Sequence, residues 1–209
     1  MKALILVDLQ HDFLPGGALA VPEGDHVIAV ANAIQPHFEL VVATQDWHPR
    51  EHESFAANHP DRVIGETINL HGLPQVLWPV HCVQGTRGAA LVDTLERGGI
   101  DRVFQKGSDP AVDSYSGFFD NGRRRSTGLG EYLQAKSVAE VYVMGLATDY
   151  CVHFTVLDAL SLGIRVVLVV DGCRAVDLRP GDGARAIDAM VAAGARLCDS
   201  REILAEGSG

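Results

Sequence analysis

The chain has 209 residues, of which 47% are hydrophobic, and a formal net charge of −10 at pH 7. Its apolar runs are far shorter than the roughly 20 residues that cross a membrane, and the acidic excess disfavours nucleic acids and anionic membranes as partners. We therefore expect a single domain spanning residues 1–209 with one large core.

Short apolar runs alternate with helical segments along the chain. The predicted strands are, in order, Ala3–Leu9, Leu40–Thr44, Arg102–Gln105, Glu140–Met144, Arg165–Val170 and Arg196–Cys198. The predicted helices are Asp25–Phe38, Leu129–Ala135, Asp149–Leu162 and Gly183–Ala193. Because the runs lack polar alternation, the strands should be buried on both faces of a mainly parallel sheet. Their alternation with helices predicts a three-layer α/β/α sandwich with six strands.

The segment 45–88 departs from this pattern, since it has little periodicity and holds most of the nine histidines. A loop-rich stretch of this length inside a compact domain is usually functional or disordered. Its tryptophans, prolines and histidines argue against disorder. We expect a metal-binding segment here.

Three chemically active side chains stand where predicted strands end. Asp8 closes the first strand, Lys106 closes the third, and Cys151 follows the fourth. Sites in open α/β sheets gather outside the carboxyl ends of the strands. If the first strand lay between the second and the third, Asp46, Asp8, Lys106 and Cys151 would line up along that edge, and we expect this strand order.

Cys151 is the candidate nucleophile. Thr148 is expected to cap the helix that follows, which would put Cys151 in its first turn, where the helix dipole and a nearby Lys106 favour a thiolate. The alternative is a packed core cysteine. His153 is two positions away and faces elsewhere, so Asp8 is the better base for the thiol proton and for a leaving amine.

Asp46 and His48 are candidate metal ligands, because positions two apart on an extended chain share a face. His81 completes a set of two histidines and one carboxylate with open coordination positions. His52 and His59 are rival ligands by spacing, and isolated histidines would be surface residues by default. The set suits one divalent ion, zinc first, with iron and manganese as alternatives.

The remaining features bear on the environment of the protein. The cysteines Cys82, Cys151, Cys173 and Cys198 are scattered without a CxxC pair, which favours free thiols. The N-terminal apolar run is too short for a signal peptide, so we expect a cytoplasmic protein. The basic cluster Arg123–Arg125 is expected to be a solvated loop. The sequence leaves open whether the chain forms a homo-oligomer.

Five ordered blocks of sequence contain the candidate residues. They are LVDLQHDFLPGGALAV, TQDWHPREHESFAANHP, LWPVHCVQGT, QKGSDPAVDSYSGF and VMGLATDYCV. In content and spacing these blocks resemble the nicotinamidase branch of the isochorismatase-like cysteine hydrolases, over nearly the whole chain. The resemblance implies the parallel sandwich of that family. It also implies a deamidase that converts nicotinamide to nicotinate and ammonia in NAD salvage, and that accepts pyrazinamide.

The resemblance also implies a role for each site residue. Asp8, Lys106 and Cys151 would form the catalytic triad, with a thioester on the cysteine, and Asp46, His48 and His81 would hold the metal. The backbone N–H groups of Ala147 and Cys151 would form the oxyanion hole, with a cis peptide before Ala147. The implied substrate pocket consists of Phe13, Leu19, Trp78, Tyr115, Leu146 and Tyr150.

Three alternatives compete with this interpretation. Another amidase or ureido-hydrolase of the same superfamily would generally lack the metal set, so the DWH and PVHC motifs separate the two. A non-catalytic binding module would not need the intact triad. A cysteine-based redox sensor would need a resolving cysteine near Cys151, and its motif contains none.

Overall fold

The computed structural model describes residues 1–206. The strands are β1 (Lys2–Val7), β2 (Leu40–Asp46), β3 (Thr67–Leu70), β4 (Leu73–Val76), β5 (Arg102–Lys106), β6 (Glu140–Leu146), β7 (Arg165–Arg174) and β8 (Arg196–Cys198). The α-helices are α1 (His26–Ile34), α2 (Leu129–Ala135), α3 (His153–Ser161), α4 (Asp182–Ala192) and α5 (Ser200–Glu206). Each predicted strand and helix is present, and α5 is an addition. Within residues 1–206, no helix combines the length and the apolar character needed to cross a membrane.

Six strands form one parallel sheet in the order β5-β2-β1-β6-β7-β8. The expected placement of the first strand between the second and the third is wrong, because β5 lies outside β2 at the edge of the sheet. That expectation assumed that Lys106 and Asp8 come from adjacent strands. The lysine stem is instead long enough to cross β2, and its Nζ reaches Asp8 Oδ2 at 2.9 Å.

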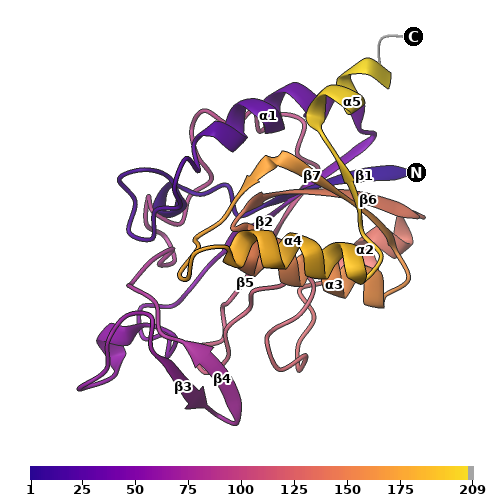
Figure 1. The fold of residues 1–209 in the computed structure, drawn as a ribbon. Coiled ribbons are helices and arrows are strands. Elements are labelled where there is room, and N and C mark those ends of the chain that lie inside the picture. The colour runs from indigo at the N-terminus through magenta and orange to yellow at the C-terminus, as the bar shows by residue number, and fades with distance from the viewer. Residues whose placement is uncertain (207–209) are drawn as a thin grey trace.

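Helices cover both faces of this sheet, which confirms the three-layer sandwich (Figure 1). α1 and α5 lie together on one face, and α2, α3 and α4 lie on the other. β1 runs through the middle, and its residues from Ala3 to Val7 have no exposed surface. This double burial explains why the strand is apolar at successive positions and not at alternate ones.

The segment 45–88 is mostly loop, as predicted, but it also contains an antiparallel hairpin of β3 and β4. In Figure 1 the hairpin projects from the body of the molecule. Its strands are only four residues long, and β4 contains Pro74, which lacks the N–H that a ladder uses. Because its strands are short and one contains a proline, the sequence pattern does not predict this hairpin.

The basic loop Arg123–Arg125 is exposed, as predicted, but it is fastened to the body. Buried Asp120 accepts the backbone N–H groups of its last two residues at 2.8 and 2.9 Å. The side chains at its two ends form ion pairs with Asp158 and Asp109. These contacts hold the segment between β5 and α2 against neighbouring parts of the molecule.

Candidate active site and metal centre

The three predicted catalytic side chains meet at the carboxyl edge of the sheet. Asp8 follows β1, Lys106 ends β5, and Cys151 lies in the helical turn after β6. Lys106 Nζ is 2.9 Å from Asp8 Oδ2 and 3.4 Å from Cys151 Sγ. The exposed fractions of Asp8, Lys106 and Cys151 are 0%, 2% and 7%. The fold thus collects three distant positions of the chain into one buried cluster.

Asp8 is oriented by its own backbone and by Thr44. Its φ of +50° lies in the left-handed region, and the chain leaves the sheet at this residue. The Thr44 hydroxyl donates to Asp8 Oδ1 at 2.6 Å and accepts the Asp8 N–H at 3.2 Å. These bonds involve Oδ1 and the backbone, and Asp8 Oδ2 pairs with Lys106.

Burial controls the protonation of this cluster. It raises the pKa of the Cys151 thiol well above its usual range, although the charge of Lys106 acts in the opposite direction. It also raises the pKa of Asp8, again against Lys106. Desolvation opposes the charge of Lys106, yet Asp46 and Asp8 hold its pKa well above the ordinary value.

The sequence predicts a resting thiolate from Lys106 and the helix dipole, and this prediction is wrong because burial is the larger effect. Burial instead favours the protonated thiol, and an Asp8 carboxylate oxygen lies within 4.8 Å of the sulfur. Attack by the sulfur therefore requires a proton acceptor, and the Asp8 carboxylate lies close enough to be the candidate.

The turn that carries Cys151 also differs from the prediction in its cap. Residues Thr148–Val152 form a π-helical turn before α3, and the N-cap residue is Ala147, with no capping bond from a side chain. The backbone N–H groups of Tyr150 and Val152 both donate to the Ala147 carbonyl at 3.1 Å. The expected cis peptide between residues 146 and 147 is present.

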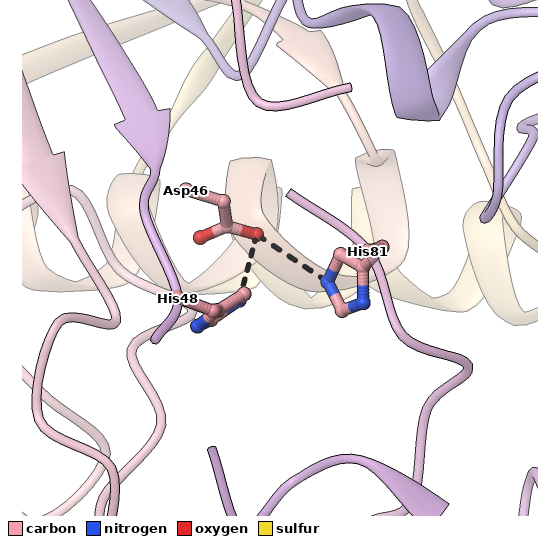
Figure 2. Close-up of side chains that lie close together, drawn as sticks. All are labelled: Asp46, His48 and His81. Carbon is pink, nitrogen blue, oxygen red and sulfur yellow. Dashed lines mark ion pairs between the residues drawn. The ribbon is translucent and has the colours of Figure 1, made fainter. Parts of the chain in front are cut away.

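The predicted metal ligands form a second buried cluster beside the first. Asp46 Oδ2 is 3.6 Å from His48 Nε2 and 3.8 Å from His81 Nε2. Figure 2 shows both rings turned toward that carboxylate. Asp46 Oδ1 pairs with Lys106, so one carboxylate joins the two clusters.

The donor atoms of this set suit a cation. Each Nδ1 lies 2.8 Å from a backbone carbonyl oxygen, that of Gly107 for His48 and that of Pro79 for His81. A carbonyl only accepts hydrogen bonds, so each Nδ1 carries a proton, and each Nε2, which faces Asp46, is the atom that can bind a cation. Although burial opposes ionisation, the neighbouring lysine holds the pKa of Asp46 well below its usual range. The three residues can therefore hold one divalent cation, with positions left for other ligands.

Of the two rival histidines, His52 lies beside this set and His59 does not. The His52 ring centroid is 4.4 Å from that of His48, and its Nδ1 is 2.7 Å from Ser54 Oγ. Burial lowers the pKa of His52 to about 4, so its ring is neutral. His59 is instead engaged by the carbonyl of Glu53, 2.6 Å from its Nε2.

A cavity beside Cys151 is lined by members of both clusters. Its lining residues are Phe13, Leu19, Asp46, His48, Trp78, His81, Asp113, Tyr115, Ala147, Tyr150, Cys151 and Val176. Of the predicted pocket residues, only Leu146 is not part of this lining. It is fully buried in the core, and the next residue, Ala147, contributes the wall instead.

Two lining residues, Asp113 and Val176, were not predicted from the sequence. Asp113 stands two residues before Tyr115 within the QKGSDPAVDSYSGF block, so its position in that block is a signal that could have identified it. Val176 follows β7 outside any recognised motif, and only the fold brings it to the cavity.

The cavity walls are aromatic. The Trp78 ring packs edge-on against Tyr150 at a centroid distance of 4.8 Å, and Tyr115 lies 5.4 Å from Tyr150. Trp78 Nε1 donates to the Tyr115 hydroxyl at 3.2 Å, which fixes both rings. Rigid aromatic walls around a nucleophile suit a small planar substrate.

Comparison with known proteins gives a consistent result. The family model described as the isochorismatase domain matches residues 2–202. The nicotinamidase of Escherichia coli K12 is 54% identical over 185 residues, which cover 87% of this chain and 86% of that protein.

Solved structures resemble the whole chain as well. A nicotinamidase and pyrazinamidase of Acinetobacter baumanii superposes with a TM-score of 0.94 at 42% identity, covering 97% of each chain. The pyrazinamidase of Pyrococcus horikoshii in complex with zinc superposes with a TM-score of 0.77 at 38% identity, covering 95% of this chain and 98% of the other.

Proposed function

The chain belongs to the isochorismatase domain family and is an amidohydrolase of the nicotinamidase type, and we propose that it hydrolyses nicotinamide to nicotinate and ammonia by way of a Cys151 thioester. The reaction is a step of NAD salvage. Pyrazinamide, which has the same carboxamide on a ring that also contains nitrogen, is proposed as a second substrate.

One observation carries this proposal. The Cys151 sulfur, with an Asp8 carboxylate oxygen within 4.8 Å, and the ligand set of Asp46, His48 and His81 face a single cavity with aromatic walls. A planar heteroaromatic amide can present its carboxamide to the sulfur and its ring nitrogen to the ligand set at the same time.

The proposed first half-reaction forms the thioester. Asp8 takes the thiol proton as Cys151 Sγ attacks the carboxamide carbon, and Lys106, 3.4 Å from the sulfur, stabilises the developing charge. The backbone N–H groups of Ala147 and Cys151 are proposed to bind the oxyanion, and one such donor is worth about 3 kcal/mol in comparable sites. Asp8 then gives its proton to the departing nitrogen, the C–N bond breaks, and ammonia leaves.

The second half-reaction reverses these roles. Asp8 accepts a proton from water, whose oxygen attacks the thioester carbon. The C–S bond breaks as Asp8 returns that proton to the sulfur, and the acid product leaves as nicotinate after losing its proton to solvent. A single carboxylate thus serves both halves, which its position between Thr44 and Lys106 allows.

The residues that would hold the metal are Asp46, His48 and His81. When bound, a divalent ion supplies a Lewis-acid position that can bind the ring nitrogen and so fix the direction of the carboxamide. Zinc is proposed first, with iron and manganese as alternatives for the same donors. The zinc-bound pyrazinamidase of P. horikoshii supports this choice.

A cytoplasmic location is also proposed. It is supported by four cysteines that are all free.

The test is release of ammonia from a panel of small amides by protein of known metal content. Nicotinamide and pyrazinamide should be turned over, whereas benzamide, which lacks a ring nitrogen, should be a poor substrate. Cys151→Ala should abolish turnover, and Cys198→Ala on the distant strand β8 should leave it unchanged. Absence of ammonia from nicotinamide would refute the function. Equal rates on nicotinamide and benzamide would refute the anchoring role of the ligand set.

A further inference from the structure

Asp46 lies where its strand has lost a neighbour. β1 pairs with β2 only as far as Leu6 opposite Ala43, and the chain turns out of the sheet at Asp8. On its other side Asp46 is still paired with Lys106 of β5. The backbone groups of Asp46 that face β1 would therefore have no ladder partner, and unpaired backbone groups are costly in a buried position.

The side chain of Gln10 takes the place of the missing strand. Its Oε1 accepts the Asp46 N–H at 2.8 Å, and its Nε2 donates to the Asp46 carbonyl at 2.8 Å. The same Nε2 donates to the carbonyl of Ala89, also at 2.8 Å. Gln10 has no exposed surface, so its carboxamide is held rigidly.

A second side chain from the same segment acts near His81. Asp12 Oδ2 accepts the N–H of Cys82 at 2.7 Å, and the Cys82 carbonyl accepts the His48 N–H at 3.0 Å. The approach of Asp12 depends on Gly88, because a Cβ there would lie 2.1 Å from the carboxylate. Asp12 thus fixes Cys82, which directly follows His81 and is also bonded to the backbone of His48.

We propose that Gln10 is a positioning residue for the metal: its carboxamide replaces a β-strand and holds the backbone of Asp46, so that this carboxylate is set opposite His48 and His81 before a cation binds. Asp12 has the same role for His81 through Cys82. This inference rests on the proposed metal site. It follows that metal affinity depends on side chains that never touch the ion, and partners of this kind change affinity by about 10–100-fold.

The chain supplies a matched control in Gln45. Its Nε2 also donates to the Ala89 carbonyl at 2.8 Å, but it makes no bond to Asp46 among the contacts of residues 1–206. Gln45→Met removes the shared contact and the bond that Gln45 accepts from Gln105 at 3.2 Å, neither of which involves Asp46. Gln10→Met removes the shared contact and both bonds to Asp46. Methionine keeps the length of the side chain in both variants.

The experiment measures zinc affinity by competition with a chromogenic chelator, and it measures urea unfolding of the metal-free proteins in parallel. Gln10→Met should bind zinc about 10–100-fold more weakly, while Gln45→Met should stay within about twofold of the unaltered protein. In Gln10→Glu a carboxylate oxygen replaces the Nε2 donor and cannot donate to the carbonyls of Asp46 and Ala89. This variant should therefore also bind zinc weakly. Asp12→Ala should weaken binding by less than Gln10→Met, because it acts through the Cys82 peptide.

The outcomes are distinct. If Gln10→Met loses metal-free stability but binds zinc like Gln45→Met, the role of Gln10 is structural only and the inference is overturned. If Gln10→Met does not fold, unaltered affinity in both Gln10→Glu and Asp12→Ala overturns it equally. If the unaltered protein itself binds no stoichiometric zinc, iron or manganese, the proposed metal site fails first.

Discussion

Lys106 lies between Asp8 and Asp46, and all three side chains are buried. The lysine is therefore both a stabilising charge for two carboxylates and the positive group nearest the Cys151 sulfur. Removing one partner of a buried ion pair usually costs about 3–5 kcal/mol, because an uncompensated charge remains. Here two carboxylates would be left facing each other.

Replacing Lys106 with methionine should consequently change stability and thiol chemistry together. We expect a loss of about 3–5 kcal/mol in the free energy of unfolding. Because Lys106 lowers the pKa of Cys151, its removal should raise that pKa further and move the alkylation profile of the thiol to higher pH. The measurements are urea unfolding and the rate of iodoacetamide modification of Cys151 against pH.

Exposed Lys136 supplies the control, since Lys136→Met should alter neither quantity. An unchanged alkylation profile in Lys106→Met would remove this residue from the catalytic group. Protection of Cys151 by nicotinamide in the unaltered protein would show that the reagent reports on the substrate site.

Asp8→Asn should be more damaging to turnover than to folding. Asparagine can still accept the Thr44 hydroxyl bond, but it cannot take the thiol proton. Losses of about 10²–10⁴ in kcat are typical when a general acid–base group is removed. Ammonia release at saturating nicotinamide measures the loss, with exposed Asp93→Asn as the control. A loss of less than about tenfold would assign the proton to another group.

At the level of elements, the Asp149 side chain ties the turn Thr148–Val152 to the segment that follows β7. Asp149 Oδ1 accepts the Val176 N–H at 3.0 Å, and its Oδ2 accepts the Asp177 N–H at 2.8 Å. Val176 is part of the cavity wall. The residue two positions before the nucleophile therefore also fixes another part of the cavity wall.

Asp149→Ala should raise KM for nicotinamide more than it lowers kcat, because it releases one wall of the cavity without touching the triad. Loss of bonds to a charged acceptor should also reduce the free energy of unfolding by about 1.5–3 kcal/mol. Asp149→Asn, which keeps one acceptor oxygen, should be intermediate. Steady-state kinetics and urea unfolding measure the two effects, with exposed Asp188→Ala on α4 as the control. A fall in kcat at constant KM would contradict the positioning role.

The sequence predicts the elements of this fold better than their arrangement. The buried strands can be predicted because β1 and its neighbours are apolar on both faces. The site residues can be predicted because they stand directly after those strands. The strand order is wrong because side-chain reach cannot be read from spacing, as the Lys106 stem shows. The prediction of a resting thiolate at Cys151 is wrong because burial in the assembled core, which the sequence does not show, raises the pKa of the thiol. The contacts of Gln10 and Asp149 join segments that no local pattern relates.

For the whole molecule, we expect that metal loss does not unfold the chain, because the hydrophobic core does not depend on the metal site. A domain of 209 residues buries enough surface to be stable by itself. A cation present at 100 times its dissociation constant adds about 2.7 kcal/mol to the folded state. Chelation should therefore lower Tm while far-UV circular dichroism and a cooperative urea transition persist.

Nicotinamide turnover should fall on chelation and return when zinc is added back. Circular dichroism before and after dialysis against a chelator, followed by ammonia release, tests both parts. Loss of the cooperative transition in metal-free protein would show that the ion is needed for the fold. Unchanged turnover in metal-free protein would exclude a role for the ion in substrate binding.

The central strand of the sheet is the first to be synthesised, and its two neighbours appear at very different times. Ala3 pairs with Leu40 of β2 on one side and with Val141 of β6 on the other. At ~5–20 residues per second, a ribosome needs roughly 5–20 s to proceed from the end of β2 to the end of β6. During that interval a strand that is apolar from Ala3 to Val7 has one open edge, which can template pairing with other chains. The yield of this protein in a cell should thus depend on chaperones that shield nascent chains and on growth temperature, even though the finished sheet buries that edge completely.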